Sequence, residues 1–362
     1  MAVLQTTLSV SIAGRDISAD LAPDLLSFEY CDVEKDEADE VSITVKDETG
    51  RWAGSWRPEG GELVTASIMS GIAPGIPTGV LPCGTFHVDS MRVSGSPRTF
   101  EMRAVSIPIN TPIRRKAKTR AWEKTDLRSI AEKIAGEAGL TLLYDSEDEP
   151  PSYDRADQDR ESDLKFLSRL ANDCGCSVKV SDDRLVIFDQ RTYEKKPAVK
   201  TITLGVSAVL SWDLSAEQSQ KYKSVTVSYR DPKAKKKGTA AGYRETGSGK
   251  DPIKGRQNPA VHAYTYTDPT VEEGQEFRIK RRAKSTAEAE RIARAKLRQL
   301  NARAVTGSVT MIGDTDLVAG VVVAVAGFGS FDGNFIIERA AHSVSSSGYT
   351  TSLSLRRVNA SY

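Results

Sequence analysis

The segment Gly327–Val344 comes nearest in this sequence to a phosphate-binding loop. It reads GFGSFDGNFIIERAAHSV, with three glycines in seven residues and one of the three histidines, His342, behind them. A dinucleotide-binding loop needs the spacing G-x-G-x-x-G between a strand and a helix. Here the third glycine comes one position late, and strand-forming residues follow it. The segment therefore predicts a turn at Asp332-Gly333 between two strands, with His342 as an ordinary polar residue on a strand face.

Other catalytic patterns in the chain are incomplete. The segment GSGKD (247–251) ends like a P-loop, but Arg244 stands where that loop needs glycine and Asp251 where it needs serine or threonine. The chain contains neither H-E-x-x-H nor G-x-S-x-G. The histidines His87, His262 and His342 are isolated in sequence, so a triad could assemble only through the fold.

Two further groups could do chemistry in other contexts. Glu147, Asp148 and Glu149 lie in a proline-flanked polar stretch that we expect to be a solvated loop, whereas a glycosidase acid needs a pocket. Cys174 and Cys176 form a C-G-C pair without the second pair of ligands that zinc requires. We expect Cys174 to complete a helix face that Gly175 caps. The sequence therefore predicts no catalytic, cofactor-binding or metal-binding residue.

Composition narrows the classes of partner. The 362 residues carry 50 Lys and Arg against 49 Asp and Glu, so no strong field favours nucleic acid or an anionic membrane. No apolar run approaches the length of a membrane span, and the N-terminus lacks a signal-peptide pattern, so we expect synthesis in a cytoplasm without export by that route. The basic clusters Lys233–Lys237 and Arg278–Lys284 lack interleaved aromatics, which favours a solvated loop or a protein-docking surface over specific nucleic-acid binding.

Residues 1–110 are predicted to form an all-β region, a barrel or a sandwich. Short alternating segments are separated by turn-forming residues such as those in GIAPGIPTG and SGSP. The expected strands are Val3–Ile12, Val41–Val45, Glu62–Met69, Thr85–Val93 and Thr99–Val105.

Residues 111–200 are predicted to form a small α/β domain. Apolar residues recur at helical spacing after Thr125, a candidate N-cap, and stop at Gly139; a second such helix follows Ser162. Two short strands come next, SVKV and RLVIFD, and the acidic stretch YDSEDEPPSYD (144–154) is expected to be a loop.

Residues 201–362 are predicted to form a second β region. It contains a flexible basic loop at 231–275 and a helix at 285–303, where Ser285 and Glu288 form a capping box. After the helix, strands run to the C-terminus. The first and second β regions share almost no visible sequence repeat.

Three segments resemble the phage late control gene D family, the baseplate hub proteins of contractile tails. Residues 158–189 contain E-S-D, a helix ending in F-L-x-R-L-A and a strand pair, in the family's order. Residues 114–140 resemble its basic stretch, tryptophan and helix. Residues 285–357 resemble its C-terminal region, in which a helix leads to a β domain ending in a histidine, G-Y-T-T and a strand.

The resemblance implies a mainly β fold with an α/β insertion, in which two tail-tube-like antiparallel β-barrels flank the small α/β domain. It implies a structural, non-enzymatic hub that forms a homotrimer and joins the hexameric tail tube to the trimeric spike. The implied partners are the chain itself, the tail tube protein and the spike protein, together with tape measure and other baseplate proteins. The implied location is the virion tail baseplate, assembled in the host bacterial cytoplasm.

Two other functions stay open at this point. One is a peptidoglycan-degrading tail enzyme, which a lytic assay on purified cell wall would distinguish. The other is the hub portion of a type VI secretion spike, whose distinguishing feature is a fused β-helical needle. The chain has no repetitive strand pattern of that kind before Tyr362, so we expect its spike to be a separate protein.

Overall fold

One curved sheet of 13 strands is the largest sheet in the described part of the chain. The computed structural model describes residues 6–71, 79–108, 111, 113–114, 116–181, 183–217, 221–230 and 261–358. The strands of the large sheet are β1 (Thr6–Ile12), β2 (Arg15–Asp16), β3 (Leu25–Val33), β4 (Glu40–Lys46), β5 (Leu63–Ser70), β6 (Gly79–Ser94), β7 (Thr99–Val105), β13 (Lys200–Thr203), β14 (Val209–Ala216), β18 (Val305–Ile312), β19 (Val322–Ala326), β20 (Gly333–Ser345) and β21 (Gly348–Arg357).

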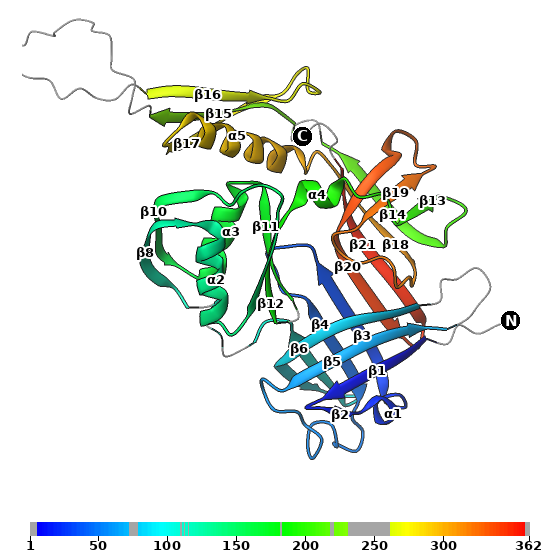
Figure 1. Ribbon diagram of the computed structural model, residues 1–362. Coiled ribbons are helices and arrows are strands. Elements are labelled where there is room, and N and C mark those ends of the chain that lie inside the picture. Colours follow the sequence, from blue (N-terminus) through cyan, green and yellow to red (C-terminus); the bar gives the residue numbers. More distant parts are fainter. Residues whose placement is uncertain are drawn as a thin grey trace, which may run out of the picture.

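The strand order places a C-terminal strand beside an N-terminal strand. The hydrogen-bonded order is β14-β18-β21-β20-β3-β4-β7-β6-β5-β1-β2, and β19 pairs with β20 and with β13. The junction is the antiparallel pair of β20 with β3, in which Arg339–Ser345 lie opposite Ser27–Val33. Figure 1 shows the red C-terminal strands continuing into the blue N-terminal ones. Among the described strands, the pairing follows an open path and closes neither β region into a ring.

Alternating side chains give this sheet one apolar face and one polar face. In β4, Val41, Ile43 and Val45 are buried, whereas Ser42 and Thr44 lie on the opposite face. The apolar face encloses one cluster under the N-terminal strands, which Val344 and Tyr349 also join, and a second cluster around Val309, Phe335 and Leu353. A short helix, α1 (Ser18–Leu21), closes the end of the first cluster through Leu21.

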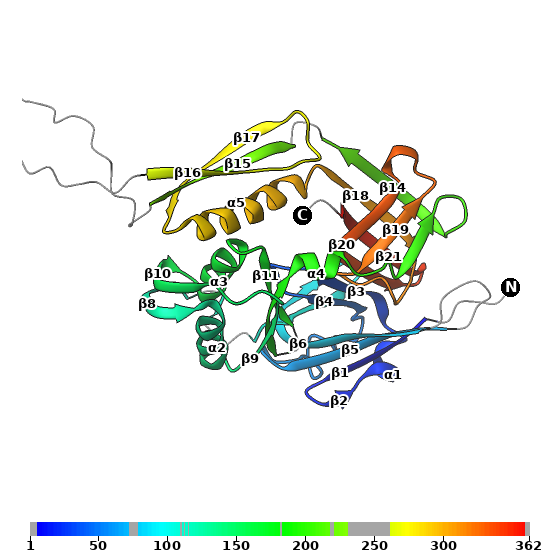
Figure 2. The ribbon, with the colours of Figure 1, turned by 45° about the horizontal axis from the view of Figure 1, so that its top comes forward.

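The middle of the chain forms a separate α/β layer. Its elements are β8 (Lys118–Asp126), α2 (Leu127–Glu137), β9 (Thr141–Asp145), β10 (Ser152–Glu161), α3 (Asp163–Asn172), β11 (Cys176–Ser181), β12 (Arg184–Asp189) and α4 (Gln190–Glu194). Strands β8 and β10 pair as a two-stranded sheet, and β11-β12-β9 form a second sheet. Helices α2 and α3 pack against these sheets through one apolar cluster that includes Ile130, Phe166 and Leu167. Figure 2 shows this layer beside the large sheet.

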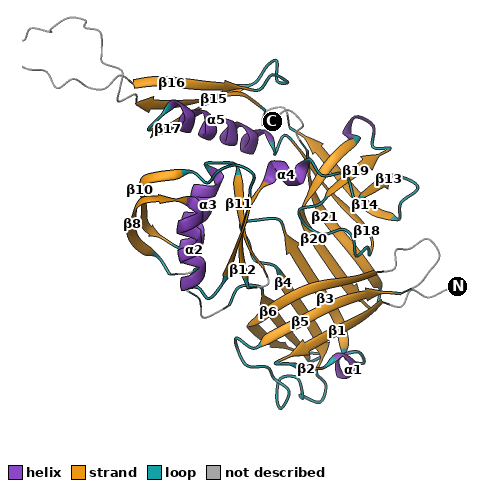
Figure 3. Ribbon diagram, in the orientation of Figure 1, coloured by secondary structure: helices purple, strands orange, loops and turns teal. Residues whose placement is uncertain are grey.

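A fourth apolar cluster lies outside the large sheet. Strands β15 (Tyr222–Arg230), β16 (Val261–Thr267) and β17 (Gln275–Ala283) form a three-stranded sheet in the order β16-β15-β17. Helix α5 (Thr286–Asn301) covers one face of it, and Val225, Val227, Ile292 and Leu297 are buried between them. Figure 3 shows this long helix lying along the strands and away from the large sheet.

Several sequence predictions are confirmed. The chain is mainly β with an α/β insertion. The turn at Asp332-Gly333 lies between β19 and β20, next to a short 3-10 turn, η2 (Gly329–Phe331), and Gly333 has a φ of +140°. Ser162 caps α3 and Ser285 caps α5, each accepting the expected backbone hydrogen bond. Among the described residues, no helix is both long and apolar enough to cross a membrane.

Other predictions are wrong in detail. We expected one loop over 231–275, but Val261–Thr267 form strand β16, because the alternate tyrosines Tyr264 and Tyr266 pack under α5. Residues 231–260 lie outside the described residues. The N-cap of α2 is Asp126 and not Thr125, because the Asp126 carboxylate accepts the Ser129 N–H. Helix α5 ends at Asn301, before the expected 303. Helix α3 ends at Asn172, so Gly175, with φ +77°, lies beyond its C-cap, Asp173.

Five strands of the first region and the middle layer have no counterpart among the predicted elements. In the first region these are β2 and β3, and in the middle layer they are β8, β9 and β10. The expected loop 144–154 ends inside β10, which begins at Ser152 and pairs with β8. The division of the chain at residues 110 and 200 stays a prediction.

Candidate functional site

The turn Glu161-Ser162-Asp163 connects β10 to α3 and carries a buried carboxylate, Asp163, with three side-chain partners. Ser162 is the N-cap, and its Oγ accepts the Lys165 N–H at 3.4 Å. Asp163 is the first residue of the helix, where a carboxylate interacts favourably with the helix dipole. Only 2% of its side chain is exposed, so its charge needs partners inside the protein.

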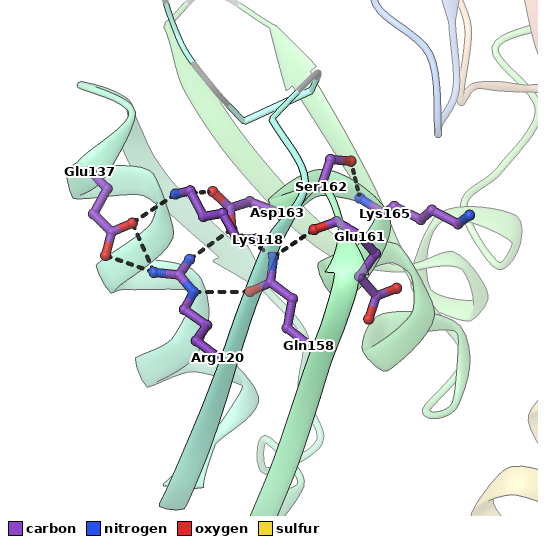
Figure 4. A network of polar contacts seen from close by, with 8 residues as sticks. All are labelled: Lys118, Arg120, Glu137, Gln158, Glu161, Ser162, Asp163 and Lys165. Carbon is purple, nitrogen blue, oxygen red and sulfur yellow. Dashed lines mark hydrogen bonds and ion pairs between the residues drawn. The ribbon is translucent and has the colours of Figure 1, made fainter.

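Two cations from β8 and one amide from β10 provide those partners. Lys118 Nζ lies 2.6 Å from Asp163 Oδ2, and Arg120 Nη2 donates to Oδ1 at 2.7 Å. Gln158 Nε2 donates to the same Oδ1 at 2.9 Å, while its Oε1 accepts from Arg120 Nε at 2.9 Å. Figure 4 shows these side chains converging between the strands and the two helices.

Glu137 at the end of α2 completes the network. Its carboxylate accepts from Lys118 at 3.1 Å and from Arg120 at 2.9 Å. Burial alone would raise the pKa of Glu137, but the hydrogen bonds from Arg120 and Lys118 outweigh it and lower that pKa. A general acid must keep its proton near neutral pH, and this carboxylate is held ionised. The network therefore fixes β8, β10, α2 and α3 to one another.

An aromatic stack extends the network into the core. The Arg120 guanidinium lies 4.5 Å from the centre of the Trp122 ring, and Trp122 stacks on Phe166 with 6.2 Å between ring centres. Lys118 and Arg120 are two residues apart on one strand, so both point to the same face. That spacing is the signal by which the sequence could have revealed them, although we predicted neither residue.

A second buried ionic cluster joins the layers of the molecule. Arg356 of β21 pairs with Glu34 at 3.0 Å, with Glu194 of α4 at 2.5 Å and with Glu338 of β20 at 3.1 Å. Arg298 of α5 lies 2.8 Å from the same Glu194. The side chains of Arg356, Glu34 and Glu194 are each at most 5% exposed.

A third contact fastens the middle layer to β3. Lys179 Nζ of β11 lies 2.7 Å from Asp32 and 3.0 Å from Asp39. Burial raises the pKa of Asp39 to about 6, although the Lys179 charge opposes the change. Asp39 also accepts the Val33 N–H, and Ser106 Oγ donates to the carbonyl of Val180. These contacts set the position of the middle layer relative to the large sheet.

The structure does not bring the three histidines together. His87 lies on β6, 3.9 Å from Asp183, and His262 stacks on Tyr229 in the outer sheet.

The other candidate residues form no catalytic arrangement in the described part of the chain. In the acidic stretch, Asp148 pairs with Arg191. In the described part of the chain, no cluster of histidine, cysteine and acidic side chains is arranged to hold a metal ion. The P-loop-like segment, with Arg244 and Asp251, lies outside the described residues.

The expectation for His342 is wrong. Its side chain is fully buried, because β20 lies over the first apolar cluster at this position. Nδ1 lies 2.7 Å from the Tyr349 hydroxyl, Nε2 lies 3.1 Å from the Leu317 carbonyl oxygen, and the ring stacks on Tyr30. Burial lowers the pKa of His342 to about 4. It is a neutral core residue.

Comparison with known proteins gives this arrangement its context. Residues 105–348 match the family model described as Phage tail baseplate hub (GPD), a range that includes the complete Asp163 network. The chain belongs to the phage tail baseplate hub family. It is therefore a component of a phage tail, and its partners are other tail proteins.

The sequence is similar to two curated relatives over nearly the full length of each chain. The chain is 24% identical to the probable baseplate hub protein of Escherichia phage 186, across 97% of this chain and 93% of the relative. It is 26% identical to the probable baseplate hub protein of Escherichia phage P2, across 94% and 90%.

Solved structures share the fold. A tail protein from Neisseria meningitidis MC58 superimposes with a TM-score of 0.67 at 15% identity, covering 97% of this chain and 96% of that one. The 43 kDa tail protein of prophage MuSo2 from Shewanella oneidensis gives the same TM-score at 14% identity, with 98% of both chains covered. A component of the Escherichia coli type VI secretion system gives a TM-score of 0.55 at 14% identity, covering 99% of this chain and 78% of that one.

Proposed function

We propose that this baseplate hub joins the tail tube to the spike as a homotrimer. The observation that carries the proposal is the match of residues 105–348 to the baseplate hub family, because the resemblance to that family implies a position between tube and spike. A trimer whose chains each contribute two β regions presents six similar units to a hexameric tube and three chains to a trimeric spike. Tape measure and other baseplate proteins would complete the contacts, after assembly in the host cytoplasm.

A reconstruction of isolated tail particles would test this proposal. The expected result is three copies of the chain in a ring between tube and spike, with light scattering giving a trimeric mass for the purified chain or for its complex with the spike. A hexameric ring of this chain would overturn the proposal, as would a position away from the tube.

We further propose that the protein is structural and has no enzymatic activity. In the described residues, the most buried carboxylate of the family signature, Asp163, is bound by Lys118 and Arg120, an arrangement suited to holding elements together. Release of soluble fragments from purified peptidoglycan, measured against a heat-treated sample, would contradict this. If Glu147→Gln or Asp148→Asn abolished that release, the acidic loop that we expect to be inert would be the source of the activity.

The hub portion of a type VI secretion spike is the second candidate. It is favoured by the shared fold with the Escherichia coli type VI component, although that likeness concerns the fold alone. Purification of the tagged chain from cells that make it would distinguish the phage hub from the type VI secretion hub. Recovery with a tail tube and baseplate supports the phage hub, whereas release into the medium that depends on a secretion apparatus supports the alternative.

A further inference from the structure

The two halves of the large sheet repeat one strand pattern. The N-terminal half has the order β3-β4-β7-β6-β5, and the C-terminal half has the order β14-β18-β21-β20-β19, with every neighbouring pair antiparallel. The pairing ladders set the correspondence residue by residue. One row of paired residues crosses four strands in each half. In the N-terminal half the row is Phe28, Ile43, Met102 and Met91. In the C-terminal half it is Trp212, Val309, Leu353 and Ala340.

Local irregularities repeat at matching positions. Strand β6 has a bulge between Val88 and Ser90, and β20 has one between Ile337 and Arg339. Just before each bulge, one residue makes two backbone hydrogen bonds to the segment that precedes a neighbouring strand, which is β5 in the first half and β19 in the second. Val88 bonds to Gly61 and Glu62, and Ile337 bonds to Gly320 and Val321.

The sequences at these positions are related, which corrects the expectation of almost no visible repeat. GTFHVD (84–89) matches GNFIIE (333–338), and both glycines have positive φ. LLSFEY (25–30) matches VLSWDL (209–214), and SITV (42–45) matches SVTM (308–311). The repeat is short and scattered, so only the strand pairing brings it into register.

One strand pair inside the chain lacks its counterpart. Strand β3 pairs with β4 on one side and with Arg339–Ser345 of β20 on the other. Its equivalent, β14, pairs with β18 alone among the described strands. The equivalent of Arg339–Ser345 begins with Ser90–Ser94 of β6. Among the described strands, these residues pair with β7 alone, because the pairing of β5 with β6 ends at His87.

Apolar side chains are left uncovered at both of these open edges. Val93 is 50% exposed and Trp212 is 49% exposed, although each belongs to the apolar face of the sheet. Their equivalents at the paired edges, His342 and Phe28, are both fully buried. An unpaired strand edge beside exposed apolar residues favours pairing with another chain.

We propose that a second copy of this chain occupies each open edge, with β14 of one copy pairing antiparallel with Ser90–Ser94 of the next. The proposal rests on the trimeric hub proposed above and names the surfaces that would form it. Within one chain, His342 lies opposite Tyr30 and Ser343 opposite Glu29. The equivalent register between copies places Val93 opposite Leu214, Ser94 opposite Asp213, and Arg92 opposite Ser215. Each copy carries both edges, so the contact is head-to-tail, and three copies would close into the ring of the proposed trimer.

Cysteine cross-linking in isolated tail particles tests the register. The double variants Arg92→Cys/Ser215→Cys and Ser94→Cys/Asp213→Cys place two thiols opposite each other on the polar face, and we expect covalent dimers and trimers on a non-reducing gel. The matched control, Arg92→Cys/Ser211→Cys, separates the thiols by four residues along the strand and should stay monomeric. The single variants and the wild-type chain, with its four native cysteines, should do so as well.

A mass measurement keeps the proposal testable should a cysteine variant fail to enter particles. Val93→Asp and Trp212→Asp should lower the fraction of trimer at least tenfold at a fixed concentration, whereas Leu143→Asp, at a 45% exposed site on β9, should leave it unchanged. Particles with a trimeric hub but no cross-link, or trimers that tolerate both aspartates, would overturn the strand pairing and leave the hub function intact. A wild-type chain that is not trimeric in the tail would instead overturn the proposed function.

Discussion

Arg356 and Glu194 form an ion pair in which both side chains are almost fully buried, at 3% and 5% exposure. The pair connects the last strand of the large sheet to α4, and through Arg298 to α5. A buried charge that loses its partner costs more than an exposed one, because water cannot replace the lost interaction. The Glu194 carboxylate, between Arg356 and Arg298, therefore connects the large sheet, α4 and α5.

Replacing Arg356 with alanine should strongly destabilise the protein. It leaves Glu34 buried without its ion-pair partner and Glu194 with Arg298 alone, and breaking a buried pair in this way typically costs about 3–5 kcal/mol. Chemical denaturation of wild type and variant would measure the loss. Arg339→Ala is the matched control, since Arg339 pairs with Glu37 at the surface, with both side chains about half exposed, and should change stability by less than about 1 kcal/mol. Equal effects of the two substitutions would contradict the prediction.

The sequence reveals those elements whose apolar residues follow a regular period. The core faces of α2, α3 and α5 come directly from helical spacing, and β7 was predicted with its observed bounds. Strand β10 could not be predicted in this way. Among its ten residues only Ala156 and Gln158 are buried, and Gln158 is held by hydrogen bonds to Arg120 and Asp163. That strand is specified by partners distant in sequence, which a local pattern does not contain.

The Asp163 network and the internal repeat could not be predicted from the sequence, for a related reason. Glu161-Ser162-Asp163 could be recognised as a family signature, but its role depends on Lys118 and Glu137, 45 and 26 residues away. In the repeat, His342 corresponds to Val93 and Trp212 to Phe28, so residue types changed while strand positions did not. Only the pairing ladders reveal such a correspondence, because they align positions without comparing side chains.

Asp163→Asn should destabilise the middle layer while keeping the side chain's shape. The amide cannot neutralise both Lys118 and Arg120, and the loss of two charge-assisted contacts should cost about 2–4 kcal/mol. Thermal unfolding followed by circular dichroism would measure the loss. Lys165→Ala provides the control, since the Lys165 side chain points away from the network and only its backbone N–H bonds to Ser162 (Figure 4). An Asp163→Asn melting temperature equal to that of the control would exclude a stabilising role.

Leu167→Asp should unfold the middle layer. Leu167 is fully buried on the apolar face of α3, between α2 and the sheet of β9, β11 and β12. A carboxylate there would be surrounded by the apolar side chains of this cluster, and its burial should cost several kcal/mol. Leu143→Asp tests the same chemical change at a 45% exposed site and should be well tolerated. Circular dichroism during heating would compare the two, and an unchanged melting temperature for Leu167→Asp would show that this face is exposed.

Stability should depend on pH through His342. Burial lowers the pKa of this histidine from 6.5 to about 4, while the nearby charges of Asp32 and Asp314 oppose the change. The folded protein therefore binds fewer protons here than the unfolded chain. The free energy of unfolding should fall by about 3 kcal/mol as the pH drops from about 6.5 through about 4. The elevated pKa of Asp39 acts in the opposite direction between about pH 4 and 6.

Comparison of wild type with His342→Gln isolates this contribution, because Asp39 is present in both proteins. The variant should be less stable at pH 7, where it loses the contacts to Tyr349 and Leu317. The difference between the two proteins should then narrow by about 3 kcal/mol on approaching pH 4. Denaturant titrations at half-unit pH intervals would measure it. A difference that is constant with pH would mean that His342 titrates normally and is not buried in solution.

Two glycines should respond to alanine in opposite directions. Gly136 lies in α2 with no atom within 4 Å of the position that a Cβ would occupy, so Gly136→Ala should stabilise the helix by about 0.5–1 kcal/mol. At Gly313 the added Cβ would lie 2.1 Å from the Tyr349 ring. That ring is buried and bonded to His342, so it cannot move aside without losing this contact. Gly313→Ala should therefore cost about 1–3 kcal/mol. Differential scanning calorimetry of both variants should give melting temperatures on either side of wild type, and a Gly313→Ala melting temperature at or above wild type would show that Tyr349 is free to move.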